Sequence, residues 1–199
     1  MKKIMFSQRV DIIESYGERR DCIDQNVYGF LAACGFLPVP VMNAPEIFEA
    51  YVDEIKPDGF LLTGGNTLVS YGGNAPERDN TEEKLLEYAV SKRIPVLGMC
   101  RGMQFILDHF GNALMPVEGH VRTMHRIAGI IERDEVNSFH NYAALEVKPP
   151  LSELARAKDG VIEAVKHSEL PIMGIMWHPE RNMPFKDEDI RMFKEFFGE

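Results

Sequence analysis

The stretch from Ile94 to Phe110 constrains the fold more than any other part of the sequence, because an apolar run passes abruptly into a helical pattern. The run up to Met99 is short, as buried parallel strands are. Beyond Gly102 the apolar residues follow helical spacing (Met103, Ile106, Leu107, Phe110), and Gly111 supplies a C-cap. Strand, sharp turn and helix, with a cysteine between two glycines, indicate a nucleophile elbow.

The cysteine in this turn is Cys100, two residues from both Gly98 and Gly102. A nucleophile in a strained turn needs small neighbours so that strand and helix can close on each other. At the N-terminus of a helix, unpaired N–H groups and the helix dipole stabilise a thiolate. The alternative is a buried structural cysteine beside two ordinary turn glycines.

The first half of the chain alternates between strand and helix patterns, which predicts an α/β fold with a mostly parallel, twisted sheet flanked by helices. We expect a polar loop from Gln8 to about Asp21 and a second, long loop from Asn66 to Asn80. The expected strands are Lys2–Ser7, Phe36–Met42 at an edge, and Gly59–Thr63. The expected helices are Asn26–Cys34, one opened by Pro45 and running to Ile55, and one capped by Asn80 and running to Val90.

The second half of the chain predicts a smaller, partly antiparallel β section. A last helix is expected from about Asp187, and Pro149-Pro150 is interpreted as a break and not a domain linker, so residues 1–199 are predicted to form one domain. The expected strands are Ile127–Ile131, Glu135–Phe139, Ala144–Val147, Gly160–Val165 and Ile172–Trp177.

Composition excludes several classes of function. The net charge of −9 argues against non-specific nucleic-acid binding. No apolar run reaches the length of a membrane helix, and the first residues are typical of a strand and not of a signal peptide. The three cysteines, Cys22, Cys34 and Cys100, suggest neither a disulfide framework nor a zinc site, so we expect a reducing cytoplasm.

A base for Cys100 is suggested by Trp177-His178-Pro179-Glu180. In an extended backbone, residues two apart point to the same side, so Glu180 can orient His178 towards the sulfur. The alternative is a surface loop after a strand.

Two donors for a developing oxyanion are also predicted. The backbone N–H of Arg101 begins the helix, and Gly64-Gly65 ends a strand where glycine permits close approach of a substrate. The alternative for Gly64-Gly65 is an ordinary strand-to-loop turn.

These motifs resemble the class I glutamine amidotransferase family over nearly the whole chain. They are Thr63–Gly65, Gly98–Gln104 and Gly174–Glu180. The resemblance implies a Cys100–His178–Glu180 triad and an oxyanion hole formed by Gly65 and Arg101. It also implies that the α-amino-acid end of the substrate is bound by Gln104 and by the segment containing Asn137, Ser138, Phe139 and His140. For His140, a hydrogen-bonded strand histidine is the alternative.

The reaction implied by the resemblance is hydrolysis of a γ-glutamyl amide through a thioester on Cys100, with no cofactor and no metal. His120 and His125 are expected to be solvated or structural.

The family contains both glutaminase subunits that serve a separate synthase and free-standing γ-glutamyl hydrolases. The loop Tyr71–Asp79 and the segment Asn137–His140 resemble the hydrolase branch. Within that branch the whole chain resembles enzymes that cleave γ-glutamyl-CDP-amidate in bacterial capsule biosynthesis. A non-catalytic sensor that uses Cys100 is the third alternative, which the intact His178 and Glu180 disfavour.

The nucleotide-linked substrate would need cations near the site. Arg9, Arg19, Arg20 and Arg78 can bind its phosphates. The alternative is that these arginines are scattered surface charges.

Overall fold

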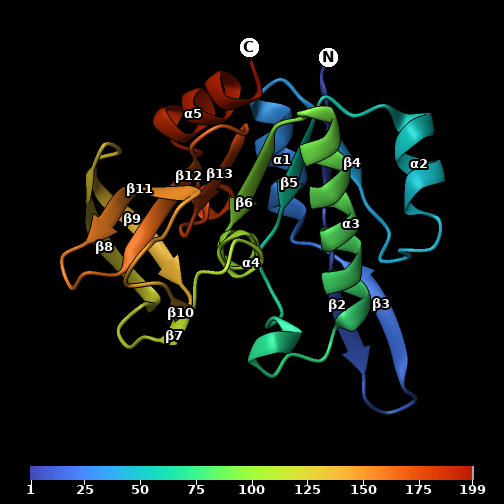
Figure 1. Cartoon of the computed structure of the whole chain (residues 1–199), viewed down its shortest axis with the longest axis horizontal. Coiled ribbons are helices and arrows are strands. Elements are labelled where there is room, and N and C mark those ends of the chain that lie inside the picture. Colours follow the sequence, from blue (N-terminus) through green and yellow to red (C-terminus); the bar gives the residue numbers. More distant parts are fainter. Residues whose placement is uncertain (199) are drawn as a thin grey trace.

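The computed structural model describes residues 1–198 as an α/β fold built on one nine-stranded sheet (Figure 1). The parallel part of the sheet runs in the order β4 (Leu37–Pro40), β1 (Lys3–Phe6), β5 (Gly59–Leu62), β6 (Val96–Met99) and β13 (Ile172–Ile175). The sheet continues with antiparallel strands β12 (Ile162–His167), β11 (Leu151–Ala157), β8 (Val121–Gly129) and β9 (Arg133–Phe139). The predicted fold class is confirmed, and the second-half strands extend the same sheet.

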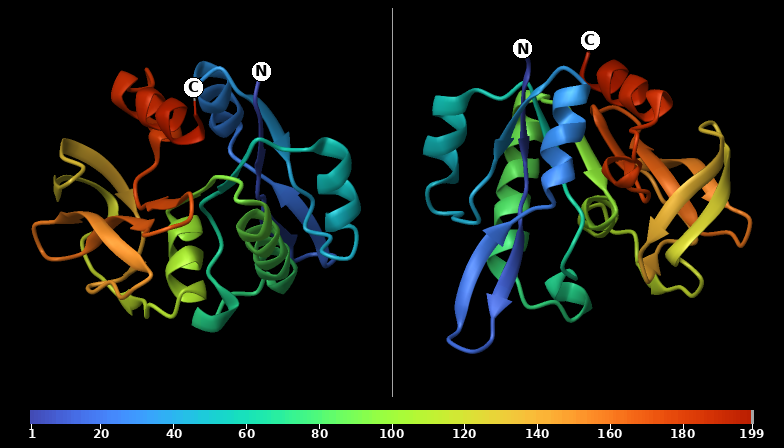
Figure 2. Two further views of the ribbon diagram at one scale, coloured as in Figure 1. Left: turned by 45° about the horizontal axis from the view of Figure 1, so that its top comes forward. Right: turned by 180° about the vertical axis from the view of Figure 1, so that it is seen from behind.

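Helices cover both faces of the parallel part (Figure 2). Helices α1 (Gln25–Ala33) and α5 (Asp187–Phe197) pack on one face, and α2 (Phe48–Ile55), α3 (Pro76–Lys92) and α4 (Arg101–His109) pack on the other. The strand residues alternate between these two cores. In β5, for example, Phe60 and Leu62 face α3 and α4, whereas Leu61 faces α1 and α5. No helix within residues 1–198 combines the length and apolar content needed to cross a membrane.

The parallel strands bring three predicted segments together. Neighbouring strands β5, β6 and β13 end at the same edge of the sheet. Thr63–Gly65 follows β5, Cys100 follows β6, and His178 follows β13 after a short connection. The carboxyl edge of a parallel sheet is where α/β proteins place their sites.

Two expectations for the region from Gln8 to Phe48 are wrong. Residues Gln8 to Asp21 are not a loop, because β2 (Arg9–Ile13) and β3 (Glu18–Cys22) form an antiparallel hairpin that projects from the body of the molecule (Figure 2). The hairpin buries few side chains, so it lacks the apolar alternation that identifies a strand. The second helix begins at Phe48, three residues after Pro45, because residues 45–47 form a turn.

Helix α3 begins at Pro76, and Asn80 lies inside it and does not cap it. Proline is tolerated at this first position because it has no N–H to leave unpaired. The early buried face of α3 consists of Arg78, Thr81 and Glu82, so its first turns lack an apolar signal. The long loop expected up to Asn80 is therefore shorter, and it contains a single 3₁₀ turn, Val69–Tyr71.

The strand expected at Ala144–Val147 is absent from the described chain, whereas β11 at Leu151–Ala157 was not predicted. A register shift between Glu153 and Ala155 breaks the alternation of buried residues in β11. The alternation of apolar and polar residues that identifies a strand is therefore interrupted within β11. A small pair, β7 (Met115–Pro116) and β10 (Tyr142–Ala143), completes the second half.

Candidate active site

Cys100 lies in the sharp turn between β6 and α4, as predicted. Its backbone has φ 54° and ψ −107°, a strained conformation for a residue with a side chain. A Cβ on Gly98 would lie 2.5 Å from the carbonyl oxygen of Gly102, and a Cβ on Gly102 would lie 2.1 Å from that of Leu62. Both glycines are therefore required by the close contact of strand and helix, and the elbow is confirmed.

His178 and Cys100 both lie against Gly64. A Cβ on Gly64 would lie 2.8 Å from Cε1 of His178 and 3.6 Å from Cβ of Cys100. Glu180 Oε1 lies 2.7 Å from His178 Nδ1, and both side chains are buried. Glu180 belongs to a 3₁₀ turn, Pro179–Arg181, and not to the extended segment that was expected. The turn still brings the carboxylate back to the imidazole.

The electrostatic environment of His178 favours its charged form. Burial lowers the pKa of His178, but the charges of Cys100 and Glu180 outweigh burial and raise it to about 10. The second ring nitrogen, Nε2, is buried and has no hydrogen-bond partner within residues 1–198. At neutral pH the imidazolium thus carries a proton that remains available to reacting atoms near Cys100.

Asn137 of β9 holds the backbone of His178. Its amide nitrogen donates to the His178 carbonyl oxygen at 2.8 Å, and its Oδ1 accepts from the His178 N–H at 2.8 Å. This pair of bonds fixes the residue that follows β13 against a strand from the far part of the sheet. The sequence pattern did not predict this role, since the two residues are distant in the chain.

Arg78 binds the backbone carbonyl groups of the loop Thr63–Gly65. The guanidinium of Arg78 is fully buried and donates to the carbonyl oxygens of all three loop residues, at 2.7 Å for Thr63 and 3.1 Å for Gly64. In a trans peptide the C=O and the following N–H point to opposite sides. The N–H of Gly65 therefore points away from Arg78.

A buried network of charges anchors this loop to the elbow. Glu82 accepts from both Arg78 and Arg101, and Asp79 accepts from Arg101. Burial lowers the pKa of Arg78 to about 9 and that of Arg101 well below its usual range. Both terminal nitrogens of the Arg101 side chain bind carboxylates of this network, and its backbone N–H begins α4 beside Cys100.

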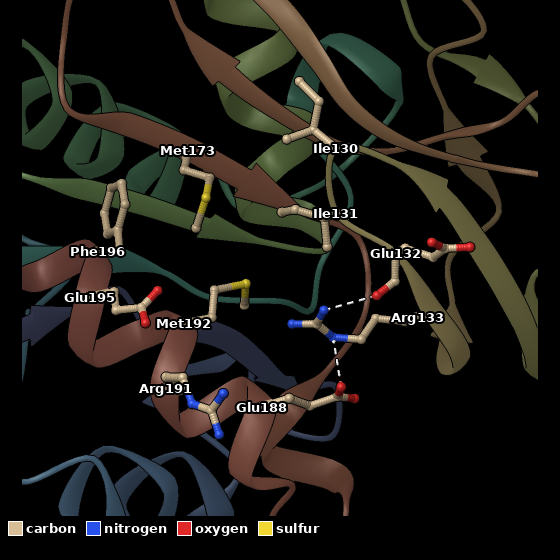
Figure 3. Close-up of a pocket in the computed structure, with 10 residues that line it drawn as sticks. All are labelled: Ile130, Ile131, Glu132, Arg133, Met173, Glu188, Arg191, Met192, Glu195 and Phe196. Carbon is tan, nitrogen blue, oxygen red and sulfur yellow. Dashed lines mark hydrogen bonds and ion pairs between the residues drawn. The ribbon is translucent and has the colours of Figure 1, made fainter.

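The hollow beside these residues is narrow. It has a volume of about 30 Å³, which is room for about one water molecule. Its lining includes Arg9, Gly64, Gly65, His178 and Arg181. A larger hollow of about 740 Å³ lies between α5 and the connection of β8 to β9, lined in part by Ile130, Met173 and Met192 (Figure 3). Cys100, His178 and Glu180 do not line that larger hollow, so its volume does not locate the chemistry.

The family described as Glutamine amidotransferase class-I matches residues 19–198. The chain belongs to the class-I glutamine amidotransferase family.

Relatives of this chain include proteins named as hydrolases and proteins named as synthase subunits. It is 35% identical over 200 residues to the γ-glutamyl-CDP-amidate hydrolase of Campylobacter jejuni, covering 98% of this chain and 97% of the relative. It is 27% identical to the γ-glutamyl-γ-aminobutyrate hydrolase of Escherichia coli O157:H7, covering 83% and 81%. It is 32% identical to a glutamine-hydrolysing GMP synthase subunit of Pyrococcus abyssi, covering 74% and 80%.

A solved structure supports the amidotransferase fold. A protein of the GMP synthase subunit type from Thermoplasma acidophilum superposes with a TM-score of 0.71 and 20% identity, covering 100% of this chain and 93% of that one. At this identity the likeness concerns the fold alone.

The residues expected to bind the α-amino-acid end of the substrate each contact a different group of the protein. Gln104 is buried and donates to the Tyr142 carbonyl oxygen at 2.8 Å. The ring of Phe139 packs edge-on against the His178 ring at 5.6 Å. Ser138 is buried and donates to the His120 carbonyl oxygen at 2.7 Å. His140 is buried, with Nε2 3.4 Å from Glu163 Oε1. Asn137 and Ser138 therefore engage protein groups with their side chains.

The four arginines considered for phosphate binding separate into distinct roles. Arg9 lines the narrow hollow together with His178 and packs its chain against Gly65. Arg19 pairs with Glu77 at 2.5 Å, and Arg20 pairs with Glu18 on the exposed hairpin. Arg78 is buried behind the loop, so its interpretation as a phosphate ligand or surface charge is wrong.

His120 and His125, which were expected to be solvated or structural, lie beside a carboxylate. His120 is buried, and both histidines contact Glu163, at 3.3 Å and 3.2 Å. Burial raises the pKa of Glu163, but its interactions with His120, His125 and His140 outweigh burial and hold the pKa well below its usual range. Glu163 is therefore an ionised carboxylate inside the protein. Its position in an ordinary apolar strand pattern gave no signal in the sequence.

Proposed function

We propose that the chain hydrolyses γ-glutamyl amides, with Cys100 as nucleophile, His178 as acid and base, and Glu180 as the residue that orients His178. The observation that carries this proposal is the position of Cys100, in a strained elbow beside the buried His178, whose Nδ1 lies 2.7 Å from Glu180. A thiolate next to an imidazolium is the reactive form of a cysteine hydrolase.

The first half of the reaction forms a thioester. The Cys100 sulfur attacks the γ-carbonyl carbon, and the carbonyl electron pair moves onto oxygen. When the carbonyl reforms, the C–N bond breaks and the departing nitrogen takes the proton from His178 Nε2. The γ-glutamyl group is then bound to sulfur, and His178 is neutral.

The second half of the reaction returns the enzyme to its starting state. Neutral His178 accepts a proton from water, and the hydroxide oxygen attacks the thioester carbon. The C–S bond breaks, glutamate leaves, and the thiolate again faces an imidazolium. We assign the negative oxygen of both intermediates to the backbone N–H groups of Gly65 and Arg101. The bonds from Arg78 to the Thr63–Gly65 carbonyls support this assignment, because they turn the Gly65 N–H to the other side.

The α-amino-acid end of the substrate is assigned to Gln104 and to the backbone of the segment from Asn137 to His140. Phe139 supports this placement through its contact with the His178 ring. We assign no direct contact to the Asn137 side chain, whose amide nitrogen and oxygen both bind the His178 backbone, or to the Ser138 hydroxyl, which donates to His120. In Gln104 the amide nitrogen binds the Tyr142 carbonyl oxygen, so the side-chain oxygen is the atom assigned to the substrate.

For the leaving group we propose the phosphoramidate nitrogen of γ-glutamyl-CDP-amidate. The 35% identity to the Campylobacter hydrolase over nearly the full length of both chains supports this choice. Arg9 and Arg181, which line the hollow beside His178, supply cations for the phosphates. A role in capsule biosynthesis follows from the same resemblance and stays a prediction, as do the cytoplasmic location expected from the three cysteines and the single domain.

The test is a comparison of substrates with the full chain. Glutamate release from γ-glutamyl-CDP-amidate should exceed release from γ-glutamyl-γ-aminobutyrate and glutamine in kcat/KM. Arg9→Ala should raise KM for the nucleotide substrate about tenfold, the effect of one charged hydrogen bond. Arg20→Ala, on the same hairpin, is the matched control and should not. Equal turnover of all three substrates would discard the nucleotide, and no turnover of any would discard the hydrolase.

A glutaminase subunit is the second candidate, supported by the 32% identity to the Pyrococcus GMP synthase subunit. Such a protein would hydrolyse glutamine slowly alone and faster with its synthase. Rapid γ-glutamyl amide turnover by the isolated chain would exclude this candidate.

A further inference from the structure

A second cluster of titratable side chains lies in the antiparallel part of the sheet. It consists of His120, which precedes β8, His125 in β8, and Glu163 in β12 (Figure 1). Each of the three offers one ligand atom, and these atoms all lie within 4.8 Å of one another. Neither the proposed hydrolysis nor the family comparison uses this cluster.

The two distances from the Glu163 carboxylate to the imidazole nitrogens are closer to the ligand spacing of a metal site than to the length of a hydrogen bond. Glu163 Oε1 lies 3.3 Å from His120 Nδ1 and 3.2 Å from His125 Nε2. Hydrogen bonds from nitrogen to oxygen centre on about 2.9 Å. In a tetrahedral zinc site with bonds of about 2.0–2.1 Å, neighbouring ligand atoms are about 3.3 Å apart.

The cluster also lacks hydrogen bonds that would satisfy it. Both carboxylate oxygens of Glu163 and Nε2 of His125 are buried without a hydrogen-bond partner among residues 1–198. Glu163 has 0% of its surface exposed. An unpaired buried carboxylate is costly, and a bound cation would offset that cost.

Asp159 orients His120 in the way that metal-binding histidines are oriented. Its Oδ2 lies 2.8 Å from His120 Nε2, so the proton is held on that nitrogen. The other nitrogen, Nδ1, is then unprotonated and faces Glu163. A carboxylate that holds the outer nitrogen of a metal-bound histidine is a recurrent feature of zinc sites.

We propose that His120 Nδ1, His125 Nε2 and the Glu163 carboxylate bind Zn²⁺, with Asp159 orienting His120. Two imidazoles and a carboxylate suit zinc, and three protein ligands leave a fourth position for water. A hollow of about 510 Å³ lined by His120, His125 and Asp159 gives the ion an entry path. His140 Nε2 lies 3.4 Å from the same Glu163 oxygen.

The zinc site would join the histidines of β8 and of the segment before it to Glu163 in β12. Ser138 of β9 donates to the His120 carbonyl oxygen, and the adjacent Asn137 holds the His178 backbone. In this position a bound zinc ion would stiffen the strand that supports His178, separate from the reacting atoms.

The test uses the full chain, stripped with EDTA and titrated with Zn²⁺, and with Co²⁺ to record its visible absorption. We expect one equivalent to bind and the absorption bands of tetrahedral cobalt to appear. His125→Ala and Glu163→Gln should weaken zinc binding at least about tenfold, since even the loss of an outer partner costs 10- to 100-fold. His109→Ala, which removes a histidine paired with Glu83 elsewhere, is the matched control and should bind as the unaltered chain does.

A folding defect in Glu163→Gln would not obscure the result. Asp159 is 54% exposed, so Asp159→Asn can be made without disturbing the core, and it should weaken binding about 10- to 100-fold. Absence of the cobalt bands, or unchanged zinc affinity in both His125→Ala and Asp159→Asn, would overturn the proposal. Neither result depends on hydrolytic activity, so the proposal fails or stands apart from the proposed function.

Discussion

The two halves of the sheet each bury a cluster of charges, and they satisfy these charges in different ways. In the parallel half, Arg78 and Arg101 are surrounded by Glu82, Asp79 and three backbone carbonyls, so both guanidinium groups have protein acceptors. In the antiparallel half, Glu163 is surrounded by imidazole nitrogens at 3.2–3.4 Å and has no hydrogen bond of good geometry within residues 1–198.

The difference between the two clusters indicates which of them would be stabilised by a bound ion. Buried charges persist only when paired or bound to a metal. The buried network of Arg78 and Arg101 contains its own carboxylates, and it holds the Thr63–Gly65 loop without a bound ion. The cluster of His120, His125 and Glu163 offers imidazole nitrogens around a carboxylate that has no hydrogen bond among residues 1–198, so a cation would complete it. Cys100 and His178 lie between the two clusters, one on each side of the boundary between β6 and β13.

The largest effect is expected from Cys100→Ala, which separates the chemistry from both clusters. Removal of a nucleophile in a triad lowers kcat by about 10⁴- to 10⁶-fold. Turnover of γ-glutamyl amides should fall by this amount, while the circular dichroism spectrum is unchanged. Cys34→Ala, which replaces a buried cysteine in the core next to α1, is the control and should retain turnover. Residual turnover within tenfold of the unaltered chain would show that the sulfur is not the nucleophile.

Breaking the arginine cluster should affect stability and activity together. Arg78→Met leaves Glu82 short of one partner and three carbonyls without a donor. Loss of one member of a buried pair costs about 3–5 kcal/mol of unfolding free energy, and release of an oxyanion donor lowers kcat about 10²- to 10³-fold. Urea unfolding and steady-state kinetics measure the two effects.

The matched control for Arg78→Met is Arg19→Met, which removes an exposed arginine paired with Glu77. It should leave both quantities unchanged, because exposed pairs contribute little. If Arg78→Met behaves like this control, the loop does not depend on Arg78.

Removing the metal should affect only the antiparallel half. A ligand present at 100 times its Kd stabilises the folded state by about 2.7 kcal/mol, so EDTA should lower the unfolding free energy by a similar amount. Amide hydrogen exchange should then accelerate in β8 and β12 and stay constant in α3 and α4. Uniform acceleration across both halves would contradict a local zinc site.

The smallest expected effect concerns the proton on His178. Its pKa is raised from 6.5 to about 10, so its charge contributes stability that is complete below about pH 6.5 and is lost as the pH rises through about 10. NMR of the imidazole should show His178 still protonated at pH 8. Cys100→Ser should lower the pKa of His178. A normal pKa in the unaltered chain would rule out the thiolate–imidazolium pair.

Much of the site could be predicted because it rests on local patterns. The elbow at Cys100 needs a short apolar strand, two glycines and a helical repeat, all within Ile94–Phe110. His178 and Glu180 lie two residues apart, and their contact was expected, although a 3₁₀ turn and not an extended strand produces it. The alternation of strands and helices predicted the parallel sheet, whose neighbouring carboxyl ends bring these segments together.

The errors have a common physical cause. The start of α3 was missed because its buried face consists of Arg78, Thr81 and Glu82, which carry no apolar period. Strand β11 was missed because a register shift interrupts its alternation. The β2–β3 hairpin was missed because it is mostly exposed. Periodicity reveals an element only when that element buries apolar side chains on one regular face.

The sequence by itself determined the class of fold, the strained cysteine and the histidine–glutamate pair, because each depends on residues close together in the chain. Only the tertiary structure decided the partners of the buried charges. Arg78 meets the Thr63–Gly65 carbonyls, and Glu163 meets His120 and His125, through contacts between elements that no local spacing records. Whether a buried polar side chain finds a partner depends on the residues of the element that packs against it, and the arrangement of strands and helices sets which element that is.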